Sequence, residues 1–233
     1  MRRTKIFSIL VIMTVMFTVS CTKDLNTKPI DPLVQRALES IAPPGVLVGH
    51  RLISPGDELG LLEAEAATIP SSLPEARRAS GAARVVARDL MAQLGRPPLP
   101  ILKGEGGMPI WPIGVAGSLA HDDRVAVAAV ANQRDASAFG IDVEPADPLP
   151  REVLEVIAKP RELNQIAGHP LGGRLLFAAK EAVYKAVYPQ DRAFLEFRDI
   201  EIDFADRTAM TSTGRLVTIR YCVSSHVLVL GLA

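Results

Sequence analysis

The stretch "GIDVEPADPLP" (residues 140–150) places two carboxylates two positions apart within an apolar run. Side chains alternate between the two faces of a strand, so Asp142 and Glu144 are expected on one face and Ile141 and Val143 on the other. Two like charges on one face repel each other. The stretch therefore predicts a buried strand whose acidic face needs a cation to offset that repulsion.

A third acid lies on a predicted helix, in "FAAKEAVYKA" (177–186), where Glu181 and Lys185 are four residues apart and share a helix face. A lone exposed pair of this kind contributes only about 0.3 kcal/mol. Combined with Asp142 and Glu144, however, it suggests three carboxylates around one hard cation. Mg²⁺ binds oxygen ligands and completes its coordination with substrate phosphates. We therefore expect a magnesium site that bridges a phosphorylated ligand.

Two further segments suggest anion binding. In "GSLAHDD" (117–123), His121 is expected at a loop or a strand end, and Ser118 offers a hydroxyl donor to a phosphate. Taken alone, such a histidine is more often a surface or capping group. Upstream, Arg77, Arg84 and Arg88 form one helical stripe, for which a solvated basic face is the plain alternative.

Composition limits the classes of protein that fit. The 233 residues carry 26 basic and 26 acidic side chains and are 48% hydrophobic, enough for one large domain or two small ones. A net charge of zero argues against bulk nucleic-acid binding. Two cysteines, Cys21 and Cys222, are too few for a disulfide framework.

The N-terminus has the layout of a bacterial export signal: residues 1–21 combine three early basic residues, a short apolar run and a cysteine after a small residue. This leader is a cleaved signal, a retained membrane anchor or an extended start. Residues 22–39 read as a polar linker. Neither segment enters the fold prediction.

The remaining chain contains strand–helix–strand material twice, which predicts an α+β fold with two similar α/β halves, residues 40–133 and 134–233. Helices are predicted from about 74 to 94, from 150 to 159, and from 171 to a stop at Pro189. Strands are predicted at 44–53, 124–133, 138–145, 195–204, 215–223 and 226–233.

The two acidic motifs together resemble the 4′-phosphopantetheinyl transferases, which show G-[IV]-D-x-E and, some forty residues later, [FW]-x-x-K-E-[AS]-x-x-K. "PIWPIGVAGSLAHDD" (109–123) is similar to the subgroup that serves enterobactin-type siderophore synthetases. The first motif alone is weak evidence for this family, but the first motif and the helix motif at the proper spacing together are strong evidence. The resemblance covers about residues 40–233.

This resemblance implies a pseudo-twofold pair of halves with coenzyme A (CoA) in the cleft between them and Mg²⁺ on the pyrophosphate. The implied reaction moves the phosphopantetheine arm onto a serine of an apo acyl or peptidyl carrier protein, in the cytoplasm. The implied metal ligands are Asp142, Glu144 and Glu181, and the implied catalytic residues are Glu181 and Lys185. The implied CoA contacts are Arg77, Arg78, Arg84, Ser118, His121, Lys180 and Lys185.

Two positions depart from the subgroup pattern. Ala120 stands where Ser or Thr usually precedes the histidine, and Gly107 stands where Arg or Lys is usual, so a cationic contact is missing unless Lys103 replaces it. These departures leave a non-catalytic CoA or nucleotide binder as an alternative. The leader leaves a second alternative, an exported lipoprotein of unrelated binding function, and it is also the reason to consider membrane association.

Overall fold

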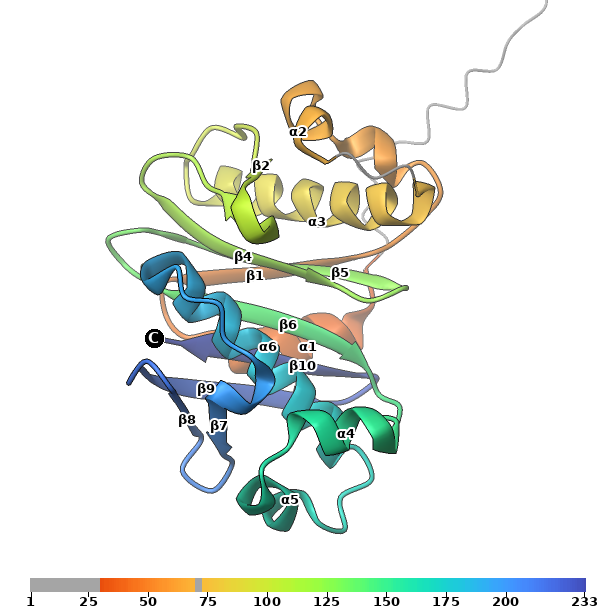
Figure 1. The fold of residues 1–233 in the computed structure, drawn as a ribbon. Coiled ribbons are helices and arrows are strands. Elements are labelled where there is room, and N and C mark those ends of the chain that lie inside the picture. Colours follow the sequence, from red (N-terminus) through yellow and green to blue (C-terminus); the bar gives the residue numbers. More distant parts are fainter. Residues whose placement is uncertain (1–29, 70–72) are drawn as a thin grey trace, which may run out of the picture.

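The computed structural model describes residues 30–69 and 73–233, which form two antiparallel sheets, each covered by a 20-residue helix (Figure 1). This arrangement confirms the predicted α+β class. The N-terminal half contains α1 (Pro32–Ile41), β1 (Val46–Leu52), α2 (Glu63–Thr68), α3 (Pro74–Gln93), β2 (Leu102–Lys103), β3 (Pro109–Ile110), β4 (Val115–His121) and β5 (Val125–Asn132). The C-terminal half contains β6 (Phe139–Pro145), α4 (Arg151–Ile157), α5 (Pro160–Ile166), α6 (Gly172–Asp191), β7 (Ile200–Asp203), β8 (Thr208–Thr211), β9 (Leu216–Val223) and β10 (His226–Leu232).

The first sheet has the order β1-β5-β4 and the second the order β6-β10-β9-β8-β7. Beside these, β2 and β3 pair with each other. The chain passes from the first sheet to the second between β5 and β6, close to the predicted boundary at residue 133. Edge strands β4 and β6 lie next to each other, so the two halves meet along these strands.

Apolar side chains form three layers, of which the middle one joins the two halves. Val86 and Leu90 of α3 pack on one face of the first sheet. The other face of that sheet packs against Ile141 and Leu230 of the second sheet, and α6 covers the far face of the second sheet. Strand β5 is consequently buried on both faces, which explains why its sequence shows no polar alternation.

Gly140 allows α6 to lie unusually close to β6. A Cβ atom at this position would overlap the carbonyl oxygen of Ala182 and come within 2.6 Å of the Ala186 nitrogen. Because residues alternate along β6, Gly140, Asp142 and Glu144 all face α6. The predicted arrangement of the two acids on one face is confirmed, and it is directed at the helix that carries Glu181 and Lys185.

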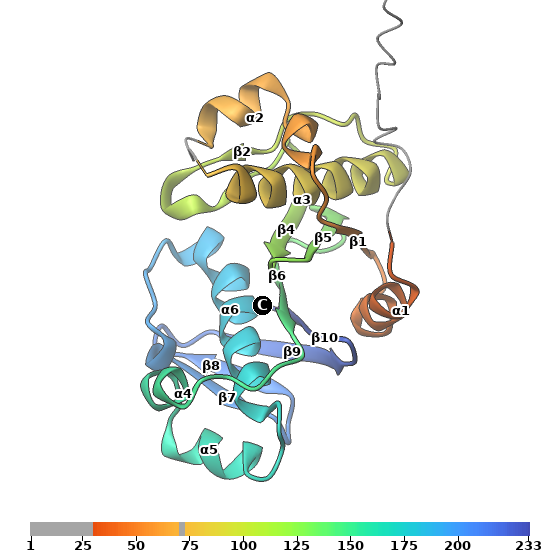
Figure 2. The same ribbon diagram turned by 90° about the vertical axis from the view of Figure 1, so that its right-hand side faces the viewer.

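The structure differs from the sequence prediction at several elements. Helices α2 and α5 and strands β2, β3 and β4 were not predicted. Helix α1 occupies residues that were expected to be linker. It is capped by Asp31, whose Oδ1 accepts the Leu33 N–H at 2.8 Å, and it buries Val34 and Leu38 between the two halves (Figure 2). Helix α6 continues two residues beyond Pro189 because the proline lies in the last turn, where few helical hydrogen bonds remain to be lost. Strand β8 was not predicted.

The leader, residues 1–21, and residues 22–29 of the expected linker lie outside the described residues. In the part of the chain that the structure describes, no helix is both long and apolar enough to cross a membrane.

Candidate active site

The carboxylate of Asp142 is buried at the junction of β6 and α6. Its Oδ1 accepts a hydrogen bond from the Lys185 ammonium at 2.6 Å, whereas its Oδ2 is buried without a hydrogen-bond partner among the described residues. Burial raises the pKa of Asp142 to about 6, although Lys185 opposes this shift, and the charge of Glu181 adds to it. The negative charge on Asp142 is therefore only partly compensated.

Glu144 lies two residues further along β6, where Arg174 of α6 reaches it. The guanidinium donates to Glu144 Oε2 at 2.8 Å and to the Asp147 carbonyl oxygen at 3.1 Å. Partial burial raises the pKa of Glu144, and the charge of Asp142 raises it further. Arg174 opposes both effects, so each acid of the motif already faces one cation from α6.

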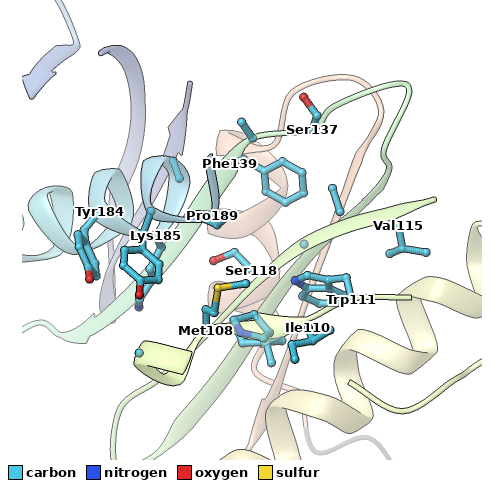
Figure 3. A pocket seen from close by; sticks show the side chains of 18 of the residues that line it. Met108, Ile110, Trp111, Val115, Ser118, Ser137, Phe139, Tyr184, Lys185 and Pro189 are labelled. Atoms are coloured by element: carbon cyan, nitrogen blue, oxygen red, sulfur yellow. The ribbon is translucent and has the colours of Figure 1, made fainter. Parts of the chain in front are cut away.

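Glu181 is half-buried on α6 and has no hydrogen-bond or ion-pair partner within the described residues. It lines a pocket of about 430 Å³ that opens between the halves. In Figure 3, Tyr184 and Lys185 of α6 approach this pocket from one side, and Trp111 and Ile110 approach it from the other. The lining is mostly apolar, with Glu181, Lys185 and Ser118 as its polar groups near α6.

Ser118 and His121 both lie on β4, a strand that the sequence did not predict as an element of its own, and His121 is the last residue of this strand. Ser118 is buried, and its Oγ accepts the Ile141 N–H at 3.0 Å, which satisfies a backbone donor on the free edge of β6. The hydroxyl proton of Ser118 stays available for a ligand in the pocket. His121 is exposed at the end of β4, yet the protein atoms around its ring lower its pKa, and the positive charge of Lys185 contributes to this shift.

The three predicted arginines lie on α3 and are engaged within the N-terminal half. Arg77 donates to the Ile69 carbonyl oxygen at 3.0 Å, and Arg78 forms a half-exposed ion pair with Glu58 at 3.2 Å. Arg84 is only 5% exposed and donates to the Ile101 carbonyl oxygen at 2.8 Å. Arg77 and Arg78 retain surface for a ligand, whereas Arg84 is part of the core under α3.

Lys180 lies apart from the other predicted site residues. Its ammonium has no exposed surface and donates to Glu162 at 2.8 Å and to three backbone carbonyl oxygens, those of Ile157, Phe197 and Ile200. These partners lie in the core of the C-terminal half, on the side of α6 away from Lys185. The structure therefore gives Lys180 a structural role, and a direct contact with CoA would require this network to open.

The two departures from the subgroup pattern have different surroundings. Gly107 is exposed with a φ of 82°, a left-handed backbone conformation that disfavours a larger residue. A Cβ there would lie 3.5 Å from Cε of Lys103, so this lysine occupies the neighbourhood of the missing cation. Ala120 is 6% exposed and packs into the core between the sheets, facing away from solvent.

The residues present fit a divalent cation by charge and donor type. Asp142 offers a buried carboxylate oxygen that lacks a hydrogen-bond partner among the described residues, and burial raises the pKa values of Asp142 and Glu144, so their anionic forms would gain from a cation. Within the described residues, however, no group of three or more acidic, histidine or cysteine side chains is arranged to hold a metal ion. Mg²⁺ commonly takes only one or two carboxylates and completes its shell with substrate oxygens and water, so two acids suffice.

Sequence analysis missed Arg174 and the aromatic lining of the pocket. Arg174, Glu181 and Lys185 have the spacing i, i+7 and i+11, which places them on one stripe of α6, so the spacing could have identified Arg174. The pocket lining could not be found in this way, because Trp111, Phe139 and Tyr184 come from three distant elements.

Comparisons with known proteins agree with this arrangement. Residues 64–131 match the model of the 4′-phosphopantetheinyl transferase N-terminal domain, and residues 138–229 match that of the 4′-phosphopantetheinyl transferase superfamily. The chain is 41% identical over 180 residues to the 4′-phosphopantetheinyl transferase Npt of Nocardia iowensis, covering 76% of this chain and 81% of the relative. It is 40% identical over 171 residues to the 4′-phosphopantetheinyl transferase Svp of Streptomyces mobaraensis, covering 70% and 69%.

The similarity to the enterobactin subgroup is weaker. Enterobactin synthase component D of Escherichia coli K12 is 32% identical over 126 residues, covering 51% of this chain and 59% of the relative. On the extent of the first two matches, the chain belongs to the 4′-phosphopantetheinyl transferase superfamily, a family of transferases.

Proposed function

We propose that this protein transfers the 4′-phosphopantetheine arm of CoA to a serine of an apo carrier protein, with Mg²⁺ as cofactor. The observation that carries this proposal is the juxtaposition of Asp142, Lys185 and Glu181 at one end of the apolar pocket between the halves. The pocket suits the uncharged pantetheine arm, and the ionic end suits the pyrophosphate.

Each residue has a distinct role in this proposal. Asp142 and Glu144 would hold Mg²⁺, which would neutralise charge on the pyrophosphate and stabilise the leaving group. Lys185 would bind a pyrophosphate oxygen, and His121, whose lowered pKa leaves its ring neutral, would donate to a CoA phosphate. Glu181 has no hydrogen-bond or ion-pair partner among the described residues, so its carboxylate would be able to accept a proton.

The reaction is a phosphoryl-type transfer. The serine oxygen attacks the phosphorus that carries the pantetheine arm, the bond from this phosphorus to the bridging oxygen breaks, and 3′,5′-ADP leaves. The serine proton passes to Glu181, directly or through water. Positioning and charge neutralisation supply most of the rate.

The test is the mass of an apo carrier protein after incubation with the protein, CoA and Mg²⁺. Addition of one phosphopantetheine group by the wild-type protein, and its loss in Glu181→Gln, supports the proposal. CoA binding without any mass change would favour the non-catalytic binder. A carrier from siderophore or nonribosomal peptide synthesis is the first to try, because the segment 109–123 resembles the enterobactin-type subgroup, although enterobactin synthase component D is a weaker match to the chain.

A further inference from the structure

Two buried polar contacts connect the halves on either side of His121. Three residues before it, Ser118 accepts the N–H of Ile141 in β6. One residue after it, Asp122 Oδ2 lies 3.3 Å from Nε2 of His226, the first residue of β10. The second contact is not used in the proposed mechanism, and neither of its residues was singled out by the sequence.

Asp122 is held in one orientation by the turn that joins β4 to β5. Its Oδ1 accepts the N–H groups of Arg124 and Val125, each at 2.7 Å, and its own N–H donates to the Val125 carbonyl oxygen at 3.0 Å. The remaining oxygen, Oδ2, is buried and has no well-aligned hydrogen bond among the described residues. It is directed to His226, and the contact is an ion pair when that histidine is protonated.

His226 connects this turn to the acidic strand. In the pairing of β10 with β6, His226 lies opposite Pro145, and the next residue, Val227, lies opposite Glu144. The two side chains of the contact are only 8% and 6% exposed, for Asp122 and His226. The contact therefore spans from the residue after His121 to the strand that neighbours Asp142 and Glu144.

Charge around the contact is mixed. His226 lies near enough to His50 of β1 to contribute to the lowered pKa of His50, although burial is the main cause. As a like charge, Asp122 contributes to the raised pKa of Glu144. Burial opposes ionisation of Asp122, but His226 and the two turn N–H groups outweigh it and lower the pKa of Asp122. Asp122 is thus an anion at neutral pH.

A buried charged contact is weak support for stability, because desolvation offsets most of its attraction. In some proteins such a contact is retained because it fixes one geometry. Here the contact fixes the short turn that begins directly after His121. It fixes this turn relative to the paired strands β6 and β10, of which β6 carries the acidic motif.

We propose that Asp122 and His226 are positioning residues that hold His121 at a fixed place relative to Asp142 and Glu144. This inference rests on the proposed function, in which His121 binds a phosphate of CoA. Loss of the contact leaves the acids and Lys185 in place but lets the β4–β5 turn move, so CoA binding weakens.

The test measures the dissociation constant for CoA by calorimetry, in the full chain and without carrier protein. Asp122→Asn keeps an oxygen for the turn N–H groups but removes the charge, and we expect the dissociation constant to rise about tenfold. The matched control is Asp123→Asn, which removes an exposed charge that also acts on His121 but has no contact with His226. We expect no change for the control.

The decisive step is a double-mutant cycle with His121→Ala. If Asp122 acts through His121, Asp122→Asn has no further effect on CoA binding once His121 is removed. A fully additive effect, or an unchanged constant in Asp122→Asn alone, overturns the inference. Should Asp122→Asn fold poorly, His226→Gln and His226→Ala repeat the cycle, and the glutamine, which keeps a donor, should retain more affinity than the alanine. Failure of wild-type protein to bind CoA would instead refute the proposed function.

Discussion

The ammonium of Lys185 lies 2.6 Å from Oδ1 of Asp142 and thereby joins α6 to β6 at the inner end of the pocket. Lys185 and Arg174 compensate two of the three nearby acids. Asp142 Oδ2 is left without a hydrogen-bond partner among the described residues, and burial raises the pKa of Asp142 to about 6 despite the contact with Lys185. This imbalance is the physical basis of the metal proposal.

The first prediction concerns removal of this charge. Asp142→Asn should reduce carrier modification by about 100-fold or more, since a group that organises charge at the reacting centre is lost. Binding of Mn²⁺, followed by its electron paramagnetic resonance signal, should weaken in parallel. Asp135→Asn, an exposed change between β5 and β6, is the control. Near-normal turnover and Mn²⁺ binding in Asp142→Asn would exclude Asp142 as a metal ligand.

The second prediction is a pH dependence of stability in the absence of divalent cations. The pKa of Asp142 is about 6 in the folded protein, mainly through burial, against an ordinary value of 3.8. The folded state therefore binds this proton more tightly than the unfolded state, and raising the pH from about 4 to about 6 lowers the free energy of unfolding. Above that window the loss is complete and constant.

Denaturant unfolding of wild-type protein and Asp142→Asn across this window isolates the effect. The variant should gain stability relative to the wild type as the pH rises. Mg²⁺ at neutral pH should then stabilise the wild type more than the variant. If the difference in free energy of unfolding between the two proteins does not change with pH, burial does not destabilise the anionic form of Asp142.

The third prediction concerns the close approach of α6 to β6. Gly140→Ala should destabilise the protein by about 1–3 kcal/mol or more and should also reduce activity, because its Cβ would push the backbone near Ala182 and Ala186 away from the acidic strand. Gly173→Ala on α6 is the control, since a Cβ at Gly173 would lie 3.3 Å from the nearest side-chain atom, on Leu149. Equal unfolding temperatures for the two variants would contradict this explanation.

The sequence predicted β6 and α6 well because their local patterns and their packing agree. Alternation along β6 and the four-residue spacing of Glu181 and Lys185 are both satisfied by the same interface. Lys180 differs: its neighbours in sequence suggest the site, whereas its partner Glu162 is 18 residues away and no local pattern indicates that they meet.

Strand β8 and helix α1 were not predicted from the sequence, because both depend on contacts with residues that are distant in sequence. Strand β8 has four residues, two of them threonines, and it is stabilised by pairing with β7 and β9. Helix α1 follows a polar segment in the sequence. Its apolar stripe contributes to the core because it packs against residues of both sheets.

The fourth prediction tests that role of α1. A chain that starts at Ile30 should unfold at the same temperature as the full-length protein, because the sequence of the leader contributes no face to the predicted core. A chain that starts at Pro43 exposes the apolar side chains that receive Val34, Leu38 and Ile41, each worth about 2 kcal/mol of burial. It should unfold at a much lower temperature. Equal stability of the two truncated chains would mean that α1 is dispensable.

The most direct test of the proposed transfer is to quantify both products of one reaction. Wild-type protein, CoA, Mg²⁺ and an apo carrier are mixed, and 3′,5′-ADP and modified carrier are measured over time. Transfer predicts that the two products appear in equal amounts, that both require Mg²⁺, and that both disappear in Glu181→Gln. CoA binding with neither product, or 3′,5′-ADP released without modified carrier, would contradict the account.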